Sequence, residues 1–368
     1  MLGSWVFGRD VLIMNSEDNL IVDAAVRIFQ DMVVPSLINE AEAGVWPSAL
    51  WETLEENGLT LAWGSDALGG AGIAMGDGFA LLKEAGRHSV PVPLAETMLA
   101  AWLLGNAGIE FPMGPMTIAP TQINTKIKVG ADGALTGTAR YVPFARRTEH
   151  VAVLANSDAG KVIALVRTAD CAIRENQSIA GEPADEVSFD GVKPTKSVRA
   201  PEGFDEQALF AMGAAIRSVQ IAGGLQKILD QSVQYSVERS QFGRPIAKFQ
   251  AIQHGLAQLA GEAAAAGAAA DAAAEAMAAT NGLGMIARAE VAAAKTRTGE
   301  AATIGTAIAH QTHGAMGFTY EHSLHHATRR LWAWRDEFGN ESYWAIELGR
   351  MVAAEGADML WPFVTGKE

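Results

Sequence analysis

The chain has 368 residues, with 42 acidic and 28 basic side chains and a net charge of −14. This balance argues against nucleic acid as the main partner, because phosphate binding needs a basic surface. About half of the residues are hydrophobic and Cys171 is the one cysteine, which excludes a disordered chain and an internal disulfide framework. The single cysteine fits a reduced, cytoplasmic setting.

No segment reads as a membrane anchor or a targeting signal. The opening MLGSWVFGRDVLIM lacks the basic region and the small-residue cleavage site of a signal peptide. The most apolar stretch, residues 260–279, is rich in alanine and is interrupted by Glu262, Asp271 and Glu275. Such a stretch favours a helix over insertion into a membrane, so we expect no membrane span.

From about residue 15 to residue 108 the pattern is helical. One predicted helix has an apolar face made of six residues: Leu20, Ile21, Ala24, Ala25, Ile28 and Phe29. From about residue 112 to residue 202 the pattern changes to strands. Residues 127–129 and 134–142 read as two strands joined by the turn GADG, and 151–155 and 161–166 read as a second such pair.

From about residue 204 the pattern is helical again, and the helices are long. We expect them over roughly 206–239, 247–279 and 285–311. The order of helices, strands and helices predicts an α+β chain with domains at 1–111, 112–203 and 204–368.

The junction VERSQFGRPIAKFQAIQ reads as a helix end, a loop and a helix start. Gly243 supplies a flexible position, and Pro245 stands just before the next helix. Arg239, Gln241 and Arg244 gather hydrogen-bond donors there. Arginine beside a helix start can bind phosphate, although an ordinary polar loop fits the same residues.

This junction resembles the signature of the acyl-CoA dehydrogenase family, which reads approximately ERxxFGxPIxxFQxxQ. QTHGAMGFT, starting at Gln311, is similar to the family's Q-x-x-G-G-x-G-[YF]-T, and GALTGTARYV resembles its β-domain strand pair. The resemblance covers nearly all of the chain after residue 15. It implies an N-terminal helical domain, a β-barrel-like middle domain and a C-terminal four-helix bundle. It also implies an FAD enzyme that oxidises acyl-CoA thioesters to 2-enoyl-CoA.

The resemblance assigns cofactor contacts to several positions. The ERxxFG segment would reach the FAD pyrophosphate across a dimer interface, and the later segment would line the adenosine portion. Tyr141 would offer a flat face to the flavin ring, and Asn340 is counted with the cofactor-binding residues. The expected set is Arg239, Gln241, Phe242, Gln311, Gly314, Gly317, Tyr141 and Asn340.

The β-domain departs from the family pattern where members contact the flavin and the substrate. The usual LTEPxxGSD is replaced by MTIAPTQINTK, residues 116–126, which has no glycine–serine–aspartate. The usual W-I-T/S-N-G is replaced by YVPFA. Pro143 offers neither a hydroxyl nor an N–H where a threonine would stand. These changes indicate either simple divergence or weakened flavin binding by this chain.

Two positions that carry the catalytic base in family members are also changed. In WAWRDEFGNESYW, residues 332–344, the family's E-G-T places Phe338 where the glutamate stands, and Glu337 comes one residue earlier. Because one residue turns a helical side chain by about 100°, Glu337 would need a shifted backbone to act. The alternative base position falls near Gly213 and Ala214. Arg217, one turn later, could meet a phosphate or a carbonyl but stays protonated. The backbone N–H of Phe338 could still polarise a thioester carbonyl.

The histidines of EHSLHHATRR are the remaining candidates for a metal site. His322 and His326 have the i, i+4 spacing of a helical metal pair, but no third ligand or HExxH context accompanies them, so we expect no metal site. The same stretch up to Arg330 offers a mildly basic patch.

Two functions remain open. The chain could be a subunit without its own base that works with a second acyl-CoA dehydrogenase subunit, as in the paired enzymes of steroid side-chain degradation. It could instead be self-sufficient, with Glu337 or Asp336 as a displaced base, or resemble an acyl-CoA oxidase. The family implies an acyl-CoA substrate, a homo- or hetero-oligomer, and an electron-transferring flavoprotein as acceptor.

Overall fold

The computed structural model describes residues 20–365. The opening stretch of the sequence and the expected helical start near residue 15 lie outside this range. Five helices come first: α1 (Leu20–Met32), α2 (Pro35–Glu42), α3 (Ser48–Glu56), α4 (Met75–His88) and α5 (Leu94–Asn106).

The first helix only partly follows its predicted apolar face. Ala25 and Phe29 are buried, but Leu20 is 74% exposed because it begins the helix beyond the packed core. α5 follows Pro93 and is buried along almost its whole length, which agrees with its lack of an amphipathic pattern.

Eight strands form the middle region: β1 (Met116–Ala119), β2 (Lys128–Val129), β3 (Leu135–Pro143), β4 (His150–Ser157), β5 (Gly160–Arg167), β6 (Ala172–Arg174), β7 (Ala184–Val192) and β8 (Lys196–Arg199). They make one sheet in the order β6-β7-β3-β2-β4-β5-β8, with β1 parallel to β4. The two expected hairpins are confirmed, since β2 pairs with β3 and β4 with β5, both antiparallel. β6 and β8 are the first and last strands of this order, and the sheet forms the expected middle β-domain.

The rest of the described chain is mainly helical: α6 (Glu206–Glu238), α7 (Gln250–Thr280), α8 (Met285–His313), α9 (Leu324–Asp336), α10 (Glu341–Glu355) and α11 (Leu360–Thr365). A two-stranded hairpin of β9 (Ser240–Gln241) and β10 (Arg244–Pro245) joins α6 to α7. α6 begins where the Asp205 carboxylate accepts hydrogen bonds from the backbone N–H groups of Gln207 and Ala208.

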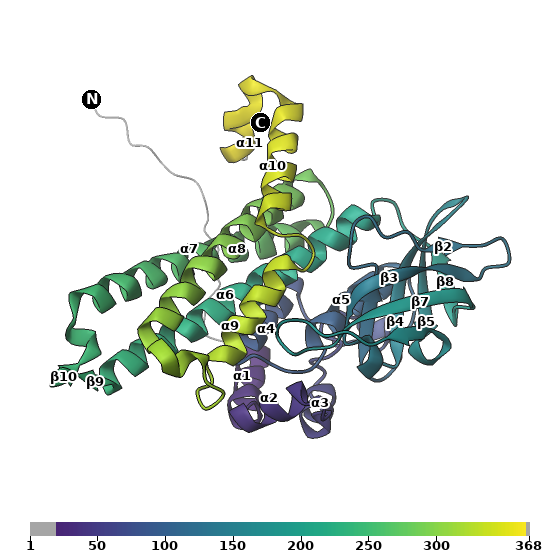
Figure 1. The fold of residues 1–368 in the computed structure, drawn as a ribbon. Helices are drawn as coiled ribbons and strands as arrows, with labels where there is room; N and C mark the ends of the chain where they lie inside the picture. Colours follow the sequence, from purple (N-terminus) through teal and green to yellow (C-terminus); the bar gives the residue numbers. More distant parts are fainter. Residues whose placement is uncertain (1–19, 366–368) are drawn as a thin grey trace.

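α6 runs through the centre of the molecule, from beside the sheet to the β9–β10 hairpin (Figure 1). Within the described residues it is the one helix long and apolar enough to cross a membrane, but that apolar stretch is completely buried inside the protein. It is therefore a core helix. Glycines let α4 approach it closely, since a Cβ on Gly223 would lie 1.9 Å from the carbonyl oxygen of Lys83.

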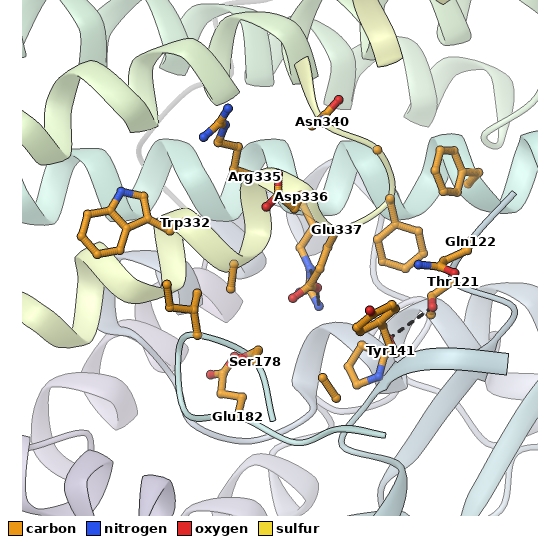
Figure 2. A pocket seen from close by; sticks show the side chains of 18 of the residues that line it. Thr121, Gln122, Tyr141, Ser178, Glu182, Trp332, Arg335, Asp336, Glu337 and Asn340 are labelled. Carbon is orange, nitrogen blue, oxygen red and sulfur yellow. Dashed lines mark hydrogen bonds and ion pairs between the residues drawn. The ribbon is translucent and has the colours of Figure 1, made fainter. Parts of the chain in front are cut away.

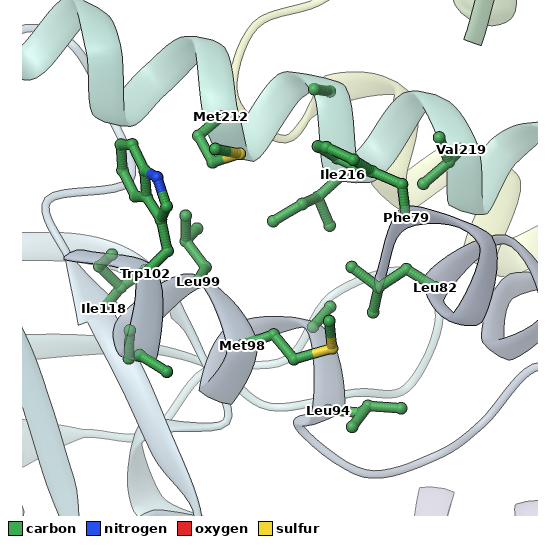
Figure 3. Packing of buried hydrophobic residues seen from close by; sticks show 14 of the residues in the cluster. Phe79, Leu82, Leu94, Met98, Leu99, Trp102, Ile118, Met212, Ile216 and Val219 are labelled. Carbon is green, nitrogen blue, oxygen red and sulfur yellow. The ribbon is translucent and has the colours of Figure 1, made fainter. Parts of the chain in front are cut away.

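One hydrophobic core joins the three regions. Figure 3 shows Leu82 of α4, Met98 of α5, Ile118 of β1 and Ile216 of α6 around the same packed interior. The sheet also has a second core on its other face, centred on residues such as Val153 and Phe189. The domain boundaries at 111/112 and 203/204 stay a prediction.

Candidate functional site

A cavity of about 840 Å³ lies between the sheet region and the C-terminal helices. One wall comes from residues 121–124, 141–144 and 177–184, and the other from α6 and the segment 332–340. Figure 2 shows Glu337 projecting into this space, with Glu182 and Ser178 across from it and Tyr141 on the sheet side. The cavity thus brings together three predicted site residues: Glu337, Tyr141 and Asn340.

The wall at residues 336–340 is a tight turn between α9 and α10. Phe338 and Gly339 both have positive φ, 52° and 89°, which reverses the chain within two residues. The Asn340 carbonyl oxygen Oδ1 then accepts a hydrogen bond from the N–H of Tyr343 at 3.0 Å and caps α10. Asn340 therefore has a structural task in addition to its place in the cavity wall.

The Phe338 ring fills the space that a catalytic carboxylate would need. It is buried, and its ring atoms lie 2.3–2.5 Å from where a Cβ on Gly213 would stand. The ring also packs edge-on against Phe210 at 6.0 Å. Positions 338 and 213 are the two at which family members are expected to carry a base. Here they contact each other, and they hold a phenylalanine and a glycine.

Glu337 lines the cavity but is held by a buried arginine. Arg217 Nε donates to Glu337 Oε2 at 2.7 Å, and Arg217 Nη2 donates to Glu96 Oε1 at 2.5 Å. The third nitrogen of Arg217 donates to Gln220. Arg217 is only 4% exposed and its donors are used, so it is not available to a phosphate or a carbonyl, contrary to the sequence-based expectation.

The ion pair with Arg217 distinguishes the Glu337 carboxylate from an unpaired catalytic base. Burial alone would lower the pKa of Arg217, but Glu337 and Glu96 raise it above its ordinary value, so it stays charged. Burial raises the pKa of Glu337, although Arg217 opposes the shift. The Glu337 side chain keeps 24% of its surface exposed. It could accept a proton, but only by weakening its ion pair with Arg217.

The backbone N–H of Phe338 donates no hydrogen bond to any of residues 20–365. The carbonyl of Phe338, in contrast, accepts from Trp344 Nε1 at 2.8 Å. An unpaired N–H in a turn beside a cavity can receive a carbonyl oxygen, and this role of Phe338 stays a prediction.

On the sheet side, Tyr141 has a positive φ of 56° and is 54% exposed, so its ring is available at the cavity wall. The nearby hydroxyl of Thr121 is already used, because it donates to the backbone carbonyls of Arg140 and Tyr141. The carbonyl of Pro143 accepts from Thr117 at 2.6 Å. The amide side chains of Gln122 and Asn124 remain as polar groups that line this wall.

The other predicted cofactor residues lie elsewhere. Arg239, Gln241 and Phe242 stand at the β9–β10 hairpin, which Figure 1 places at the end of α6 away from the sheet. Arg239 follows Arg217 by 22 residues, or roughly 33 Å at about 1.5 Å per residue. Phe242 is 92% exposed. These residues therefore do not line the cavity of the same chain.

Gln311, Gly314 and Gly317 lie at the end of α8 and in the short turn after it. Gln311 and Gly314 are exposed. Gly317 is buried, and a Cβ at this position would lie 2.9 Å from the Cβ of His313. None of the three lines the cavity. Their assignment to the adenosine portion of FAD stays a proposal.

The histidine-rich stretch forms packed interior and is not a basic patch. His325, His326 and Arg330 are buried, and Arg330 is paired with Glu42 and Glu182. The sequence-based expectation of a patch for phosphates was therefore wrong at these residues. Within residues 20–365 no group of three His, Cys, Asp or Glu side chains could hold a metal ion.

Sequence reasoning missed two residues that support the site. Glu96 is a single carboxylate in the apolar run LAETMLAAWLL, and Lys295 is a single lysine in an alanine-rich helix. Both are buried. A lone charge in an apolar helical stretch is a signal that could have identified Glu96, because such a charge needs a buried partner. Lys295 carries no such signal, since Arg297 and Glu300 lie close to it in the sequence.

Comparison with known proteins agrees with this geometry. Residues 205–341 match the acyl-CoA dehydrogenase C-terminal domain family. The C-terminal region of the chain therefore belongs to this family. Acyl-CoA dehydrogenase IpdE2 of Mycolicibacterium smegmatis is 26% identical over 315 residues, covering 84% of this chain and 91% of the relative. Benzylmalonyl-CoA dehydrogenase of Aromatoleum aromaticum is 28% identical, covering 67% and 75%.

Solved structures show the same fold. The ChsE4–ChsE5 complex from Mycobacterium tuberculosis aligns with a TM-score of 0.83 at 20% identity, covering 92% of this chain and 97% of that one. Butyryl-CoA dehydrogenase from Megasphaera elsdenii aligns with a TM-score of 0.78 at 19% identity, covering 90% and 97%. The chain is thus an acyl-CoA dehydrogenase-like, FAD-dependent oxidoreductase for the α,β-dehydrogenation of acyl-CoA.

The cavity fits one part of FAD better than another. The Tyr141 ring and the amides of Gln122 and Asn124 suit a flat ring with polar edges. The anionic pyrophosphate fits less well, because the two basic residues of the cavity wall are both paired: Arg217 with Glu96 and Glu337, and Arg335 with Glu341. The diphosphate therefore needs cations from outside this cavity.

Proposed function

We propose that this chain is a half-site subunit of a heteromeric acyl-CoA dehydrogenase, and that a second acyl-CoA dehydrogenase subunit supplies the catalytic base. The observation that carries the proposal is the packing of Phe338 against Gly213. A carboxylate must reach the α-carbon of the thioester for proton abstraction, and neither of these positions can provide one.

The reaction divides into parts that this chain can and cannot perform. FAD, when bound, accepts the hydride that leaves the β-carbon. The unpaired N–H of Phe338 could bind the thioester carbonyl and acidify the α-proton. The fixed pairing of Glu337 with Arg217 keeps that carboxylate from acting freely, so proton removal is assigned to the partner.

The exposed hairpin supports an arrangement in which subunits share the cofactor. Arg239 and Gln241 are exposed there, and the neighbouring Arg244 packs over the Phe249 ring at 4.4 Å. In an assembly, Arg239 would provide a cation for the pyrophosphate of FAD in a neighbouring subunit, which the paired arginines of the cavity do not. Gln311, Gly314 and Gly317 would face the adenosine portion, and Phe242 would pack at the same interface.

The names of similar proteins suggest the substrate class and the partner. The ChsE4–ChsE5 structure is described as a complex, and another fold neighbour is described as a steroid acyl-CoA dehydrogenase. We propose a bulky acyl-CoA from steroid degradation as the substrate, an electron-transferring flavoprotein as the electron acceptor, and a cytoplasmic location.

The decisive experiment measures flavin content and acyl-CoA-dependent flavin bleaching in the chain alone and with a second acyl-CoA dehydrogenase subunit encoded beside it. We expect flavin to be retained and bleached only in the mixed assembly. Bleaching by an acyl-CoA in the isolated chain would overturn the proposal.

A self-sufficient enzyme is the second candidate, and the exposure of Glu337 in the cavity favours it. Glu337→Gln separates the two functions. General-base loss costs about 10²–10⁴-fold in rate, so a self-sufficient enzyme would lose bleaching while still binding acyl-CoA. In a half-site subunit the bleaching rate of the assembly changes little. Asp336→Asn is tested in parallel, because Asp336 is the neighbouring exposed carboxylate of the cavity wall and the other candidate for a displaced base.

A further inference from the structure

Lys295 is the one lysine among the buried residues that the structure describes. It lies in α8 and does not line the cavity. A buried ammonium group is costly unless it is fully hydrogen-bonded or paired. Its position therefore needs a reason, and the partners of its Nζ atom supply one.

The Nζ atom donates two hydrogen bonds to the end of α9. One goes to the carbonyl oxygen of Trp334 and the other to that of Arg335, both at 2.7 Å. The last carbonyls of a helix have no partner within the helix, and they carry the negative end of its dipole. The Lys295 ammonium group gives these carbonyls a hydrogen-bond donor and places a positive charge at the negative end of the helix dipole. It lies about 40 residues away in the sequence.

These carbonyls come directly before the turn that borders the cavity. Glu337 and Phe338 follow Arg335 by two and three residues. α8 also packs tightly on the start of α10, since a Cβ on Gly299, one helical turn after Lys295, would lie 2.9 Å from Glu341 Oε2. α8 thus contacts the turn on both its incoming and its outgoing side.

We propose that Lys295 is a positioning residue, which fixes the shape of turn 336–340 and so places the Phe338 N–H for a thioester carbonyl. It touches neither the cavity nor the reacting atoms, and acts through the two carbonyls that it binds. The inference rests on the proposed function in one respect, namely that an acyl-CoA enters this cavity.

The test compares Lys295→Met, an unbranched side chain one atom shorter and without the charge, with Thr298→Val. Thr298 is fully buried on the same helix, and its hydroxyl is bonded only to the carbonyl of Lys295, at 3.4 Å. Hydrogen exchange is measured by mass spectrometry on the full chain in its flavin-containing assembly. Hydrogen bonds to a charged group are stronger than neutral ones, so we expect amides in residues 333–345 to exchange about tenfold faster or more in Lys295→Met.

Thr298→Val should leave exchange in that segment within about twofold of the wild type, and exchange in the sheet should be unchanged in both variants. Lys295→Gln keeps an amide donor on a shorter side chain and should give intermediate exchange. Unchanged exchange over residues 333–345 in Lys295→Met would overturn the inference. So would equal acceleration throughout the chain, because that would show general destabilisation.

A binding measurement connects the turn to its ligand. In the same assembly, octanoyl-CoA should bind at least about fivefold more weakly to Lys295→Met than to the wild type. Free coenzyme A, which lacks the acyl chain and its thioester carbonyl, should bind equally to the variant and the wild type. Equal weakening for both ligands, or for neither, would count against positioning of the carbonyl site. Absence of binding by octanoyl-CoA and by a bulky acyl-CoA in the wild type would instead count against the proposed function, and the exchange experiment would still decide the role of Lys295.

Discussion

Phe338 and Gly213 depend on each other at the scale of single residues. The aromatic ring occupies the volume that any side chain at position 213 would enter, with the nearest ring atom 2.3 Å from the ideal Cβ. Restoring a carboxylate at position 213 therefore requires a smaller residue at position 338. A single Phe338→Glu substitution would also put a second carboxylate close to Glu337 and its ion pair with Arg217.

Gly213→Ala should destabilise the protein because the added methyl overlaps the Phe338 ring. Overpacking of a core costs about 1–3 kcal/mol, measurable by urea unfolding. Gly261→Ala in α7 is the control, since a Cβ there meets nothing within 4 Å and alanine favours the helix. Adding Phe338→Ala to Gly213→Ala should remove most of the overlap cost. Strict additivity of the two changes would contradict the packing described here.

Arg217→Met should be strongly destabilising at neutral pH and less so in acid. Removing one partner of a buried ion pair costs about 3–5 kcal/mol. Burial raises the pKa of Glu337, and Arg217 is the main group that opposes this shift, so the variant carries a carboxyl with a still higher pKa. A folded state whose carboxyl binds protons more tightly than the unfolded state loses stability as pH rises. Urea unfolding from pH 5 to pH 8 should show the deficit growing with pH, and a constant deficit would argue against this reading of the site.

At the scale of elements, the end of α9 is held by a side chain from α8. Burial lowers the pKa of Lys295 to about 7, although Glu337 opposes the shift. The unfolded chain keeps an ordinary lysine pKa, about 10.4, and so binds more protons than the folded protein between these values. The wild type should therefore gain stability relative to Lys295→Met as pH rises from 7 to 9, by up to about 1.4 kcal/mol per pH unit. Thermal unfolding of both proteins across that range measures this gain, and below pH 6 the stability difference between them should no longer change with pH.

The β9–β10 hairpin should matter for the cofactor and not for the fold of the chain. Arg239 is exposed, so Arg239→Ala should leave unfolding of the isolated chain within about 0.5 kcal/mol of the wild type. In the assembly that binds flavin, the same variant should lose flavin on dialysis, because a charge-assisted contact to pyrophosphate is lost. Arg174→Ala in β6, an exposed arginine paired with Glu186, is the control. Equal flavin retention by both variants would reject Arg239 as a cofactor residue.

At the scale of the whole molecule, local sequence patterns were enough to predict most of the helices and strands. The long helices were predicted to within a few residues, because each is a long stretch of helix-forming residues without proline, and the two hairpins followed from alternation and turn residues. What sequence could not supply was pairing across the chain. That Arg217 is shared by Glu96 and Glu337, 121 and 120 residues away, depends on the packing of three separate elements.

The chain should form an oligomer in solution. The hairpin and α6 expose large apolar side chains, among them Val237 and Phe242, and the proposed cofactor site needs a neighbour. Light scattering at micromolar concentration should give a dimer or a larger species, alone or with its partner. A single species near 38.8 kDa, both for the chain alone and for the chain with its partner, would contradict the proposed oligomer.

The hydrophobic core shared by α4, α5, β1 and α6 also bears on how the chain would respond to a protease. Cleavage in an exposed connection, such as the segment that contains Gln122 and Asn124, cuts the backbone but leaves Met98, Ile118 and Ile216 packed against one another. The two pieces would elute together as a nicked protein and separate only in denaturant. For the same reason, the part from residue 205 onward would not survive as an autonomous module, since it would present the buried face of α6 to water.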